Sequence, residues 1–147
     1  MTPVCETLLY MASRAQLVQE VIAPKLKQGI IVLCDRWLDA TVAYQGYGAG
    51  VDIKWIHSLG KEATQGIQPK LTTFLNLPLL CGLRRAKGFK KADRMENKTI
   101  RFHEKVRRGY LAIAKKEPKR FISLNVKETD TIRQVHEKIK KVIQSVI

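Results

Sequence analysis

Asp35 and Arg36 form an acidic–basic pair directly after a short apolar run at residues 29–34. A short, continuous apolar run predicts a strand buried on both faces of a parallel sheet. Ligands of open parallel sheets bind beyond the carboxyl ends of the strands, where this pair falls. An arginine fork matches phosphate oxygens bidentately, and an aspartate can orient a nucleophile or a metal-bound water. The pair therefore indicates phosphate chemistry, although an ion pair at a turn explains it equally well.

A second pair, Tyr10 and Arg14, is spaced four residues apart and so shares one face of a predicted helix. A planar ring beside a guanidinium could stack on a nucleobase and donate to its carbonyl oxygen. Taken alone, an ordinary surface Tyr–Arg pair is the simpler interpretation of these two residues.

A longer string decides between these interpretations. Residues 35–48 read DRWLDATVAYQGYG, and this closely resembles the DR(Y/W/H)…S/T…AYQG segment of thymidylate kinases (dTMP kinases). The resemblance continues over nearly the whole chain, through segments similar to that family's thymine-binding helix, its lid and the following helix: residues 6–14, 82–85, 93–96 and 102–110. It implies phosphoryl transfer from ATP to dTMP, giving dTDP, with Mg²⁺ accompanying ATP. It also leaves room for a homodimer.

The resemblance implies a role for each matching residue on the acceptor side. Tyr10 and Arg14 would lie against thymine, and Thr41 and Gln45 would hydrogen-bond it. The dTMP-binding set is thus Tyr10, Arg14, Arg36, Thr41, Tyr44 and Gln45. Tyr44 would lie under the sugar and obstruct a ribose 2′-hydroxyl, although plain core packing explains this residue equally well. Asp35 and Arg36 would be catalytic, with Arg36 holding the acceptor phosphate and Asp35 orienting attack or joining the magnesium shell.

On the ATP side, the resemblance places Arg85 against adenine and makes residues of about 84–97 the lid. Lys90, Lys91 and Arg94 would bring positive charge over the transferring phosphates, with Arg94 counted as catalytic. Solvation is the simpler explanation for lysines in a loop, and the lid assignment rests on the family match.

One motif that the resemblance requires does not occur in the sequence. No G-x-x-x-x-G-K-[ST] string is present, and neither is the family's Arg-Glu-Pro segment. The P-loop strand of such kinases would lie between strands at 30–34 and 71–77. We therefore expect a truncated kinase that lacks the first two strands and is inactive alone. A non-catalytic dTMP-binding remnant and one half of a split kinase are the alternatives.

Composition narrows the remaining choices. The 147 residues carry a net charge of +14 and are 45% hydrophobic, which is typical of a globular domain with anionic partners. A basic nucleic-acid-binding module is the competing function, but it needs interleaved aromatic residues, and residues 84–101 contain only Phe89. Three scattered cysteines favour reducing cytosol, and no apolar run is long enough for a membrane span.

Helical and strand patterns alternate along the chain, so the predicted fold class is α/β with a parallel sheet, an incomplete P-loop kinase-like fold in one domain of residues 1–147. Helices are predicted at about 4–27, 53–65, 79–86 and 94–116, and after a capping Asp130. Strands are predicted at 30–34, 71–77 and 121–126, and a loop at 87–92.

Overall fold

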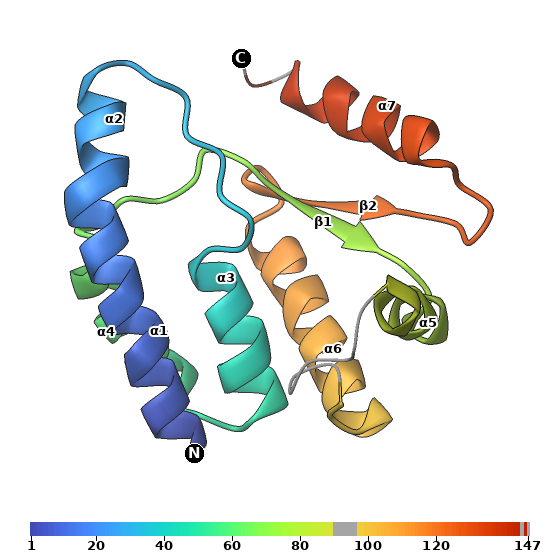
Figure 1. Cartoon of the computed structure of the whole chain (residues 1–147), viewed down its shortest axis with the longest axis horizontal. Coiled ribbons are helices and arrows are strands. Elements are labelled where there is room, and N and C mark those ends of the chain that lie inside the picture. Colours follow the sequence, from blue (N-terminus) through green and yellow to red (C-terminus); the bar gives the residue numbers. More distant parts are fainter. Residues whose placement is uncertain (90–96, 145, 147) are drawn as a thin grey trace. The chain divides into compact units, whose positions relative to one another are not determined.

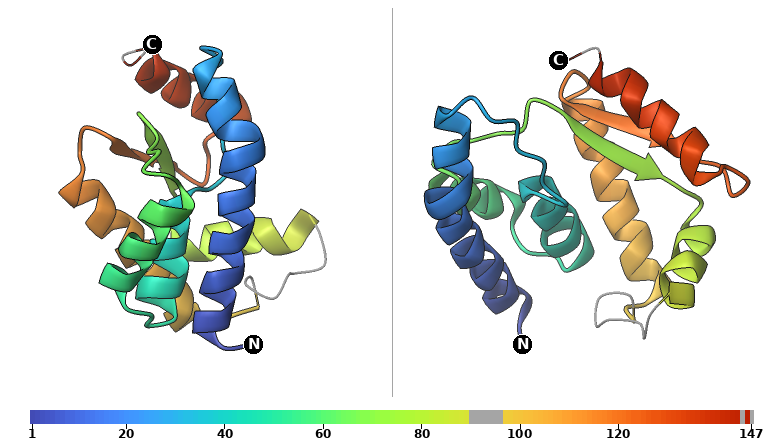
Figure 2. Two further views of the ribbon diagram at one scale, coloured as in Figure 1. Left: turned by 90° about the vertical axis from the view of Figure 1, so that its left-hand side faces the viewer. Right: turned by 45° about the horizontal axis from the view of Figure 1, so that its top comes forward.

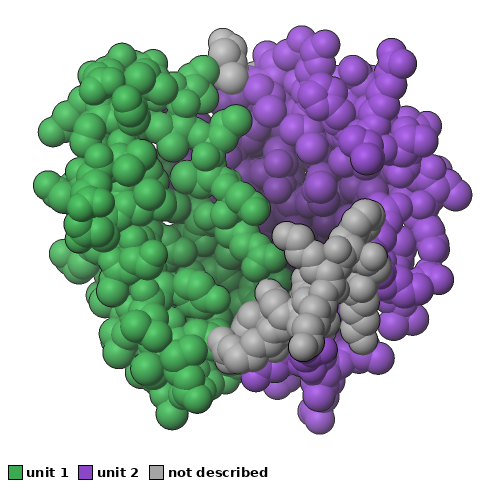
Figure 3. Space-filling model, in the orientation of Figure 1, with its two compact units in different colours: residues 1–68 green, residues 69–147 purple. Residues whose placement is uncertain are grey.

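The computed structural model describes residues 1–89, 97–144 and 146, in two compact units, residues 1–68 and 69–147 (Figure 3). The first unit is helical, and the second contains a parallel sheet with helices around it. The combination gives the predicted α/β class, while the prediction of a single domain stays a prediction. No helix in the described parts of the chain is both long and apolar enough to cross a membrane.

A long helical rod begins the first unit (Figure 1) and consists of α1 (Pro3–Leu17), η1 (Val18–Ile22) and α2 (Ala23–Lys27). The rod begins where Thr2 accepts a hydrogen bond from the Cys5 N–H, with proline at the first helical position. It confirms the helix predicted at 4–27. Its buried face contains Met11, Val18 and Ile22, whereas Leu8 is exposed.

Two further helical segments complete this unit. The first consists of α3 (Leu38–Thr41) and η2 (Val42–Gly48), and the second is α4 (Ile53–Ala63). Asp52 caps α4, which confirms the helix predicted at 53–65, by accepting from the Trp55 N–H. The segment η2 is a π-helix, a wider winding with i→i+5 hydrogen bonds that is frequent at functional sites. Gly46 lies in η2 and packs against α4, since a Cβ there would come 3.0 Å from Ile53 Cγ1.

The strand predicted at 30–34 is wrong for this structure. The segment has no strand hydrogen bonds with any described residue, and only Ile30 bonds a helix, through Lys25 O. Ile31 is 66% exposed and Leu33 88% exposed. The pattern predicted the extended, apolar character of the segment, but a strand also needs a neighbour for its backbone groups. No described residue provides one.

The second unit is built on β1 (Thr72–Asn76) and β2 (Phe121–Asn125), which pair in parallel and confirm two predicted strands. The helices α6 (Ile100–Lys116) and α7 (Ile132–Ile143) lie on opposite sides of this sheet (Figures 1 and 2). Tyr110 of α6 stacks on Phe74 with ring centroids 4.6 Å apart and contacts Phe121 at 6.2 Å. This aromatic cluster fixes α6 against both strands.

The remaining helix boundaries differ from the predictions in three ways. Helix α5 (Leu79–Phe89) is longer than the predicted 79–86 and includes part of the predicted loop. Helix α6 begins at Ile100 under a Thr99 cap rather than at about residue 94, which lies outside the described residues. Helix α7 is capped by Thr131 and not by Asp130, because Thr131 and Gln134 form a reciprocal capping box.

Candidate functional site

Arg14 is the centre of a polar cluster in the first unit, where α1 runs beside the α3–η2 segment (Figure 1). Its Nη2 donates to Thr41 Oγ1 at 3.1 Å and to the main-chain oxygen of Trp37 at 3.4 Å. The guanidinium carbon lies 5.4 Å from the centre of the Trp37 ring. Burial lowers the pKa of Arg14, and the Asp39 carboxylate opposes this shift. The cluster fixes one cationic donor on a largely buried helix face.

Gln45 and Glu6 form a buried pair beside this cluster. Gln45, on η2, donates from Nε2 to Glu6 Oε1, on α1, over 2.7 Å. Gln45 is 2% exposed and Glu6 is 8% exposed. A buried carboxyl group lacks water to bond and needs a partner from the protein. The bond from Gln45 provides this partner and links η2 to α1.

Arg36 and Tyr44 form a third contact in the same unit. The guanidinium of Arg36 lies over the Tyr44 ring, 5.3 Å from its centre. The backbone of Arg36 has φ of +70°, the left-handed region that non-glycine residues seldom adopt. Such strain clusters at binding and catalytic positions, where the surrounding fold imposes it. Here the strained residue is the one predicted to hold phosphate.

Asp35 and Tyr10 differ from the other predicted residues because they make no hydrogen bond or ring contact with any described residue. Asp35 is exposed, and Tyr10 is 44% exposed on α1, one turn before Arg14. Both side chains therefore face solvent in the part of the chain that the structure describes.

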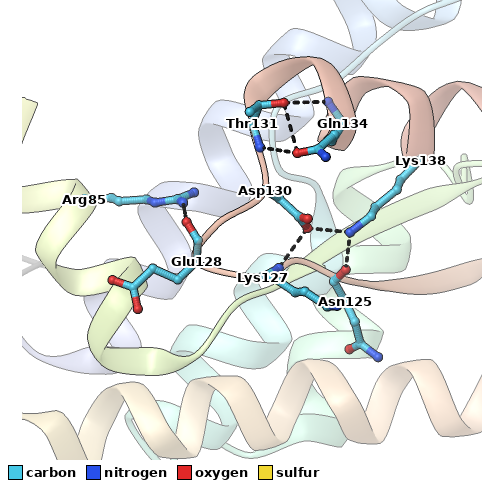
Figure 4. Close-up of polar contacts among 8 residues, drawn as sticks. All are labelled: Arg85, Asn125, Lys127, Glu128, Asp130, Thr131, Gln134 and Lys138. Carbon is cyan, nitrogen blue, oxygen red and sulfur yellow. Dashed lines mark hydrogen bonds and ion pairs between the residues drawn. The ribbon is translucent and has the colours of Figure 1, made fainter.

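In the second unit, Arg85 of α5 donates from Nη2 to the main-chain oxygen of Glu128 at 2.8 Å (Figure 4). Arg84 forms an ion pair of 2.6 Å with the Glu128 carboxylate. The side chain of Arg85 thus lies at the loop after β2, an edge of a parallel sheet where ligands commonly bind. Lys90, Lys91 and Arg94 lie outside the described residues.

The loop after β2 is held by its own charges. Asp130 accepts hydrogen bonds from the Lys138 ammonium and from the Lys127 N–H, and Lys138 also donates to Asn125 O (Figure 4). These bonds lower the pKa of Asp130, the one from Lys138 most. The loop that receives Arg85 is thereby tied to α7.

Few side chains that could bind a metal ion lie together in the described parts of the chain. The described residues contain no group of three or more His, Cys, Asp or Glu side chains that could hold an ion. Asp35 offers one exposed carboxylate. Mg²⁺ usually keeps several waters and binds one or two carboxylates together with substrate phosphates. The side chains present therefore fit a metal that arrives with a phosphate ligand and do not form a site of their own.

The structure adds two residues that the sequence argument missed, Glu6 and Trp37. Glu6 stands four residues before Tyr10 and eight before Arg14, so the row of i, i+4 spacings could have indicated it. The sequence assigns Trp37 no role beyond its place in the string after Asp35. Its burial and its ring contact with Arg14 have no signal in spacing, because they join residues 23 positions apart.

The sequence comparisons all match one protein family. The sequence model of the thymidylate kinase family matches residues 1–139. The chain is 42% identical over 139 residues to the thymidylate kinase of Kosmotoga olearia, and the match covers 95% of the chain and 66% of that relative. It is 47% identical over 130 residues to that of Desulfovibrio desulfuricans, which covers 84% of the chain and 60% of that relative. The chain thus spans slightly less than two thirds of these relatives' length.

A solved structure gives the same result. The crystal structure of thymidylate kinase from Ehrlichia chaffeensis superimposes with a TM-score of 0.76 at 31% identity, and the match covers 98% of this chain and 66% of that one. The structural likeness extends over both units, although the sequence match is lower than with the relatives above.

Proposed function

Because the chain belongs to the thymidylate kinase family, we propose that, together with a P-loop segment, it transfers a phosphoryl group from ATP to dTMP, giving ADP and dTDP. Residues 1–68 are proposed to hold dTMP. The observation that carries this proposal is the cluster of Arg14, Thr41 and Gln45, three polar side chains fixed on adjoining helices at a largely buried site.

The proposed roles on the dTMP side follow from the side chains. Arg14 donates to a thymine carbonyl oxygen, with Tyr10 against the ring, while Thr41 and Gln45 bond the base edge. Tyr44 lies under the sugar, where its ring is already in contact with the Arg36 guanidinium. Arg36 binds the phosphate as a fork of charged donors.

On the donor side, we assign Arg85 to the adenine of ATP, and Lys90, Lys91 and Arg94 to the transferring phosphates. Support for Arg85 comes from its tether to Glu128 O at the edge of a parallel sheet. The three lid residues rest on the family membership alone.

Mg²⁺ is proposed to enter with ATP, which agrees with the single carboxylate that Asp35 offers. When bound, the ion would neutralise phosphate charge. Phosphoryl transfer depends mainly on positioning and charge stabilisation, and the work of this chain's own residues is to hold and orient the acceptor phosphate. Asp35 orients the attacking oxygen.

We also propose a cytosolic protein, supported by three unpaired thiols, Cys5, Cys34 and Cys81. A homodimer remains part of the proposal on family grounds.

Calorimetric titration of the full chain with dTMP and with ATP tests the proposal. We expect dTMP to bind more tightly than ATP, because the sequence contains the dTMP-side residues but no P-loop motif. Arg14→Ala should raise the Kd for dTMP by about tenfold or more, the scale of a charged hydrogen bond. Arg101→Ala, at an exposed arginine of α6, is the control. Equal affinity for dTMP in all three proteins would remove the Arg14 cluster from the site.

A further inference from the structure

The buried hydrogen bond between Gln45 and Glu6 fixes which way the Gln45 amide is turned. A carboxylate accepts hydrogen bonds and donates none, so it fixes the Gln45 NH₂ toward itself at 2.7 Å. The carbonyl oxygen of Gln45, Oε1, then points to the other side of the amide. No described residue donates to this oxygen, and it is not among the buried side-chain atoms that lack a partner. The oxygen is therefore open to water or to a ligand.

The neighbouring groups have fixed polarity as well. Arg14 can only donate, and it already occupies the Thr41 oxygen at 3.1 Å, which leaves the Thr41 hydroxyl hydrogen for another acceptor. Together the three side chains offer donors from Arg14 and Thr41 and an acceptor from Gln45. This set complements a base edge that presents carbonyl oxygens with an N–H between them.

We propose that Glu6 is a positioning residue that selects the base through Gln45. Thymine and uracil carry an N3–H that donates to an acceptor, whereas cytosine carries a bare N3 that needs a donor. With Glu6 in place, Gln45 offers Oε1 and accepts from N3–H. If Glu6 were replaced by an amide, Gln45 could turn over and offer its NH₂ to a bare N3. This inference rests on the proposed binding of dTMP to residues 1–68.

The mechanism predicts a change of selectivity and not only of affinity. A site that holds a buried group for a substrate N–H rejects the analogue without it, because the group is left unpaired. Glu6→Gln should therefore weaken dTMP by about tenfold and leave dCMP binding equal or stronger, which compresses the dTMP/dCMP affinity ratio.

The test is calorimetric titration of the full chain with dTMP, dCMP and N3-methyl-dTMP. Wild type should prefer dTMP, and N3-methylation should abolish most of this preference. In Glu6→Gln, N3-methylation should lower the affinity several-fold less than in wild type. The reason is that Gln45 no longer offers an acceptor to the N3–H that methylation removes. Glu6→Asp keeps the acceptor and should retain the wild-type ratio between dTMP and dCMP. Glu62→Gln, at an exposed position of α4, is the matched control.

The outcomes separate the two proposals. If wild type binds dTMP selectively and Glu6→Gln keeps the same ratio, Glu6 has no positioning role, while the proposed function stands. If wild type binds no dTMP, both proposals fail.

A measurement on wild type covers the case in which Glu6→Gln does not fold. The side-chain NH₂ signals of Gln45 should exchange slowly with water compared with those of exposed Gln28, and should keep their Overhauser contacts to Glu6 when dTMP binds. Strong nuclear Overhauser effects from these NH₂ protons to the bound base, with none to Glu6, would show that the amide donates to the base, which overturns the proposal.

Discussion

Arg14 donates to the hydroxyl oxygen of Thr41, 27 positions later in the chain, over 3.1 Å. The same Nη2 reaches Trp37 O, and the guanidinium plane faces the Trp37 ring. One planar cation therefore bonds the turn before α3 and the end of α3 at the same time. Lysine, a point charge on a flexible stem, could satisfy one of these partners but not the whole set.

Arg14→Lys should accordingly lower the free energy of unfolding by about 1–2 kcal/mol, the scale of a lost part-buried hydrogen bond to a charged group. Urea unfolding followed by circular dichroism measures the change. Arg101→Lys on the exposed side of α6 should change stability by less than about 0.5 kcal/mol. Equal stabilities of the two variants would mean that the fork geometry of Arg14 is unimportant.

Two substitutions of Arg36 separate the effect of its strained backbone on stability from the effect of its guanidinium on dTMP binding. Glycine adopts positive φ without penalty, so Arg36→Gly relieves the strained backbone that Arg36→Ala retains. We expect Arg36→Gly to be more stable than Arg36→Ala by about 1 kcal/mol, whereas both weaken dTMP by about 2–3 kcal/mol. Thermal unfolding and calorimetric titration give the two quantities. Unchanged dTMP affinity in both variants would exclude Arg36 from phosphate binding.

The 147-residue chain should show no measurable dTMP kinase activity by itself, because its sequence contains no motif to cradle the β- and γ-phosphates. A coupled assay of ADP formation with dTMP, ATP and Mg²⁺ measures this. Activity should appear when a segment with a P-loop strand and helix is supplied as a second chain. Turnover of about 1 s⁻¹ by the chain alone would contradict the prediction.

The exposed segment at 30–34 should make the chain prone to aggregate. Ile31 is 66% exposed and Leu33 88% exposed, in an uncharged, β-prone stretch where no described residue pairs the backbone as a strand. The double substitution Ile31→Lys and Leu33→Lys should reduce light scattering at equal concentration while the unfolding midpoint stays within a few degrees. Leu26→Lys, at an apolar residue that is 42% exposed within α2, is the control. Equal scattering by all three proteins would mean that the segment is not the cause.

The pH dependence of stability should include a contribution from Asp130. Hydrogen bonds from Lys138 and from the Lys127 N–H hold its pKa in the folded protein below the ordinary value of 3.8. Because the unfolded state binds the proton first, this stabilisation is present above about pH 4 and is lost as the pH falls through the lower folded pKa. Asp130→Asn should flatten the decline of unfolding free energy below pH 4. Glu137→Gln, exposed on α7, should leave the decline unchanged.

The sequence predicted what depends on local pattern. Helix α4 begins where a helix was predicted, and β1 lies within the strand predicted at 71–77, since hydrophobic patterns act over a few residues. The sequence also grouped Arg14 with Thr41, which accepts a hydrogen bond from it, but did not predict the contact with Trp37. The Glu6–Gln45 bond was not, because it joins residues 39 positions apart whose pairing only tertiary packing decides.

Two features of the structure could not be predicted from the sequence, for a different reason. The segment at 30–34 has the composition of a strand, but strand formation requires a partner that no described residue supplies. The left-handed backbone at Arg36 runs against the intrinsic preference of arginine, so no propensity argument could have predicted it. Both lie beside the candidate site, where local preference is overruled by surroundings.

The close approach of Gly46 to α4 limits which substitutions this gene can accumulate. A methyl group at position 46 would stand 3.0 Å from Ile53 Cγ1 and 3.4 Å from Ile56 Cδ1, so a larger residue fits only if one of these side chains gives way. If neither side chain gives way, η2 has to shift, and Gln45, the neighbour of Gly46, moves with it. Positions 46 and 53 should therefore change together among descendants of this gene, as a coupled pair whose mismatch alters the choice of base without touching it.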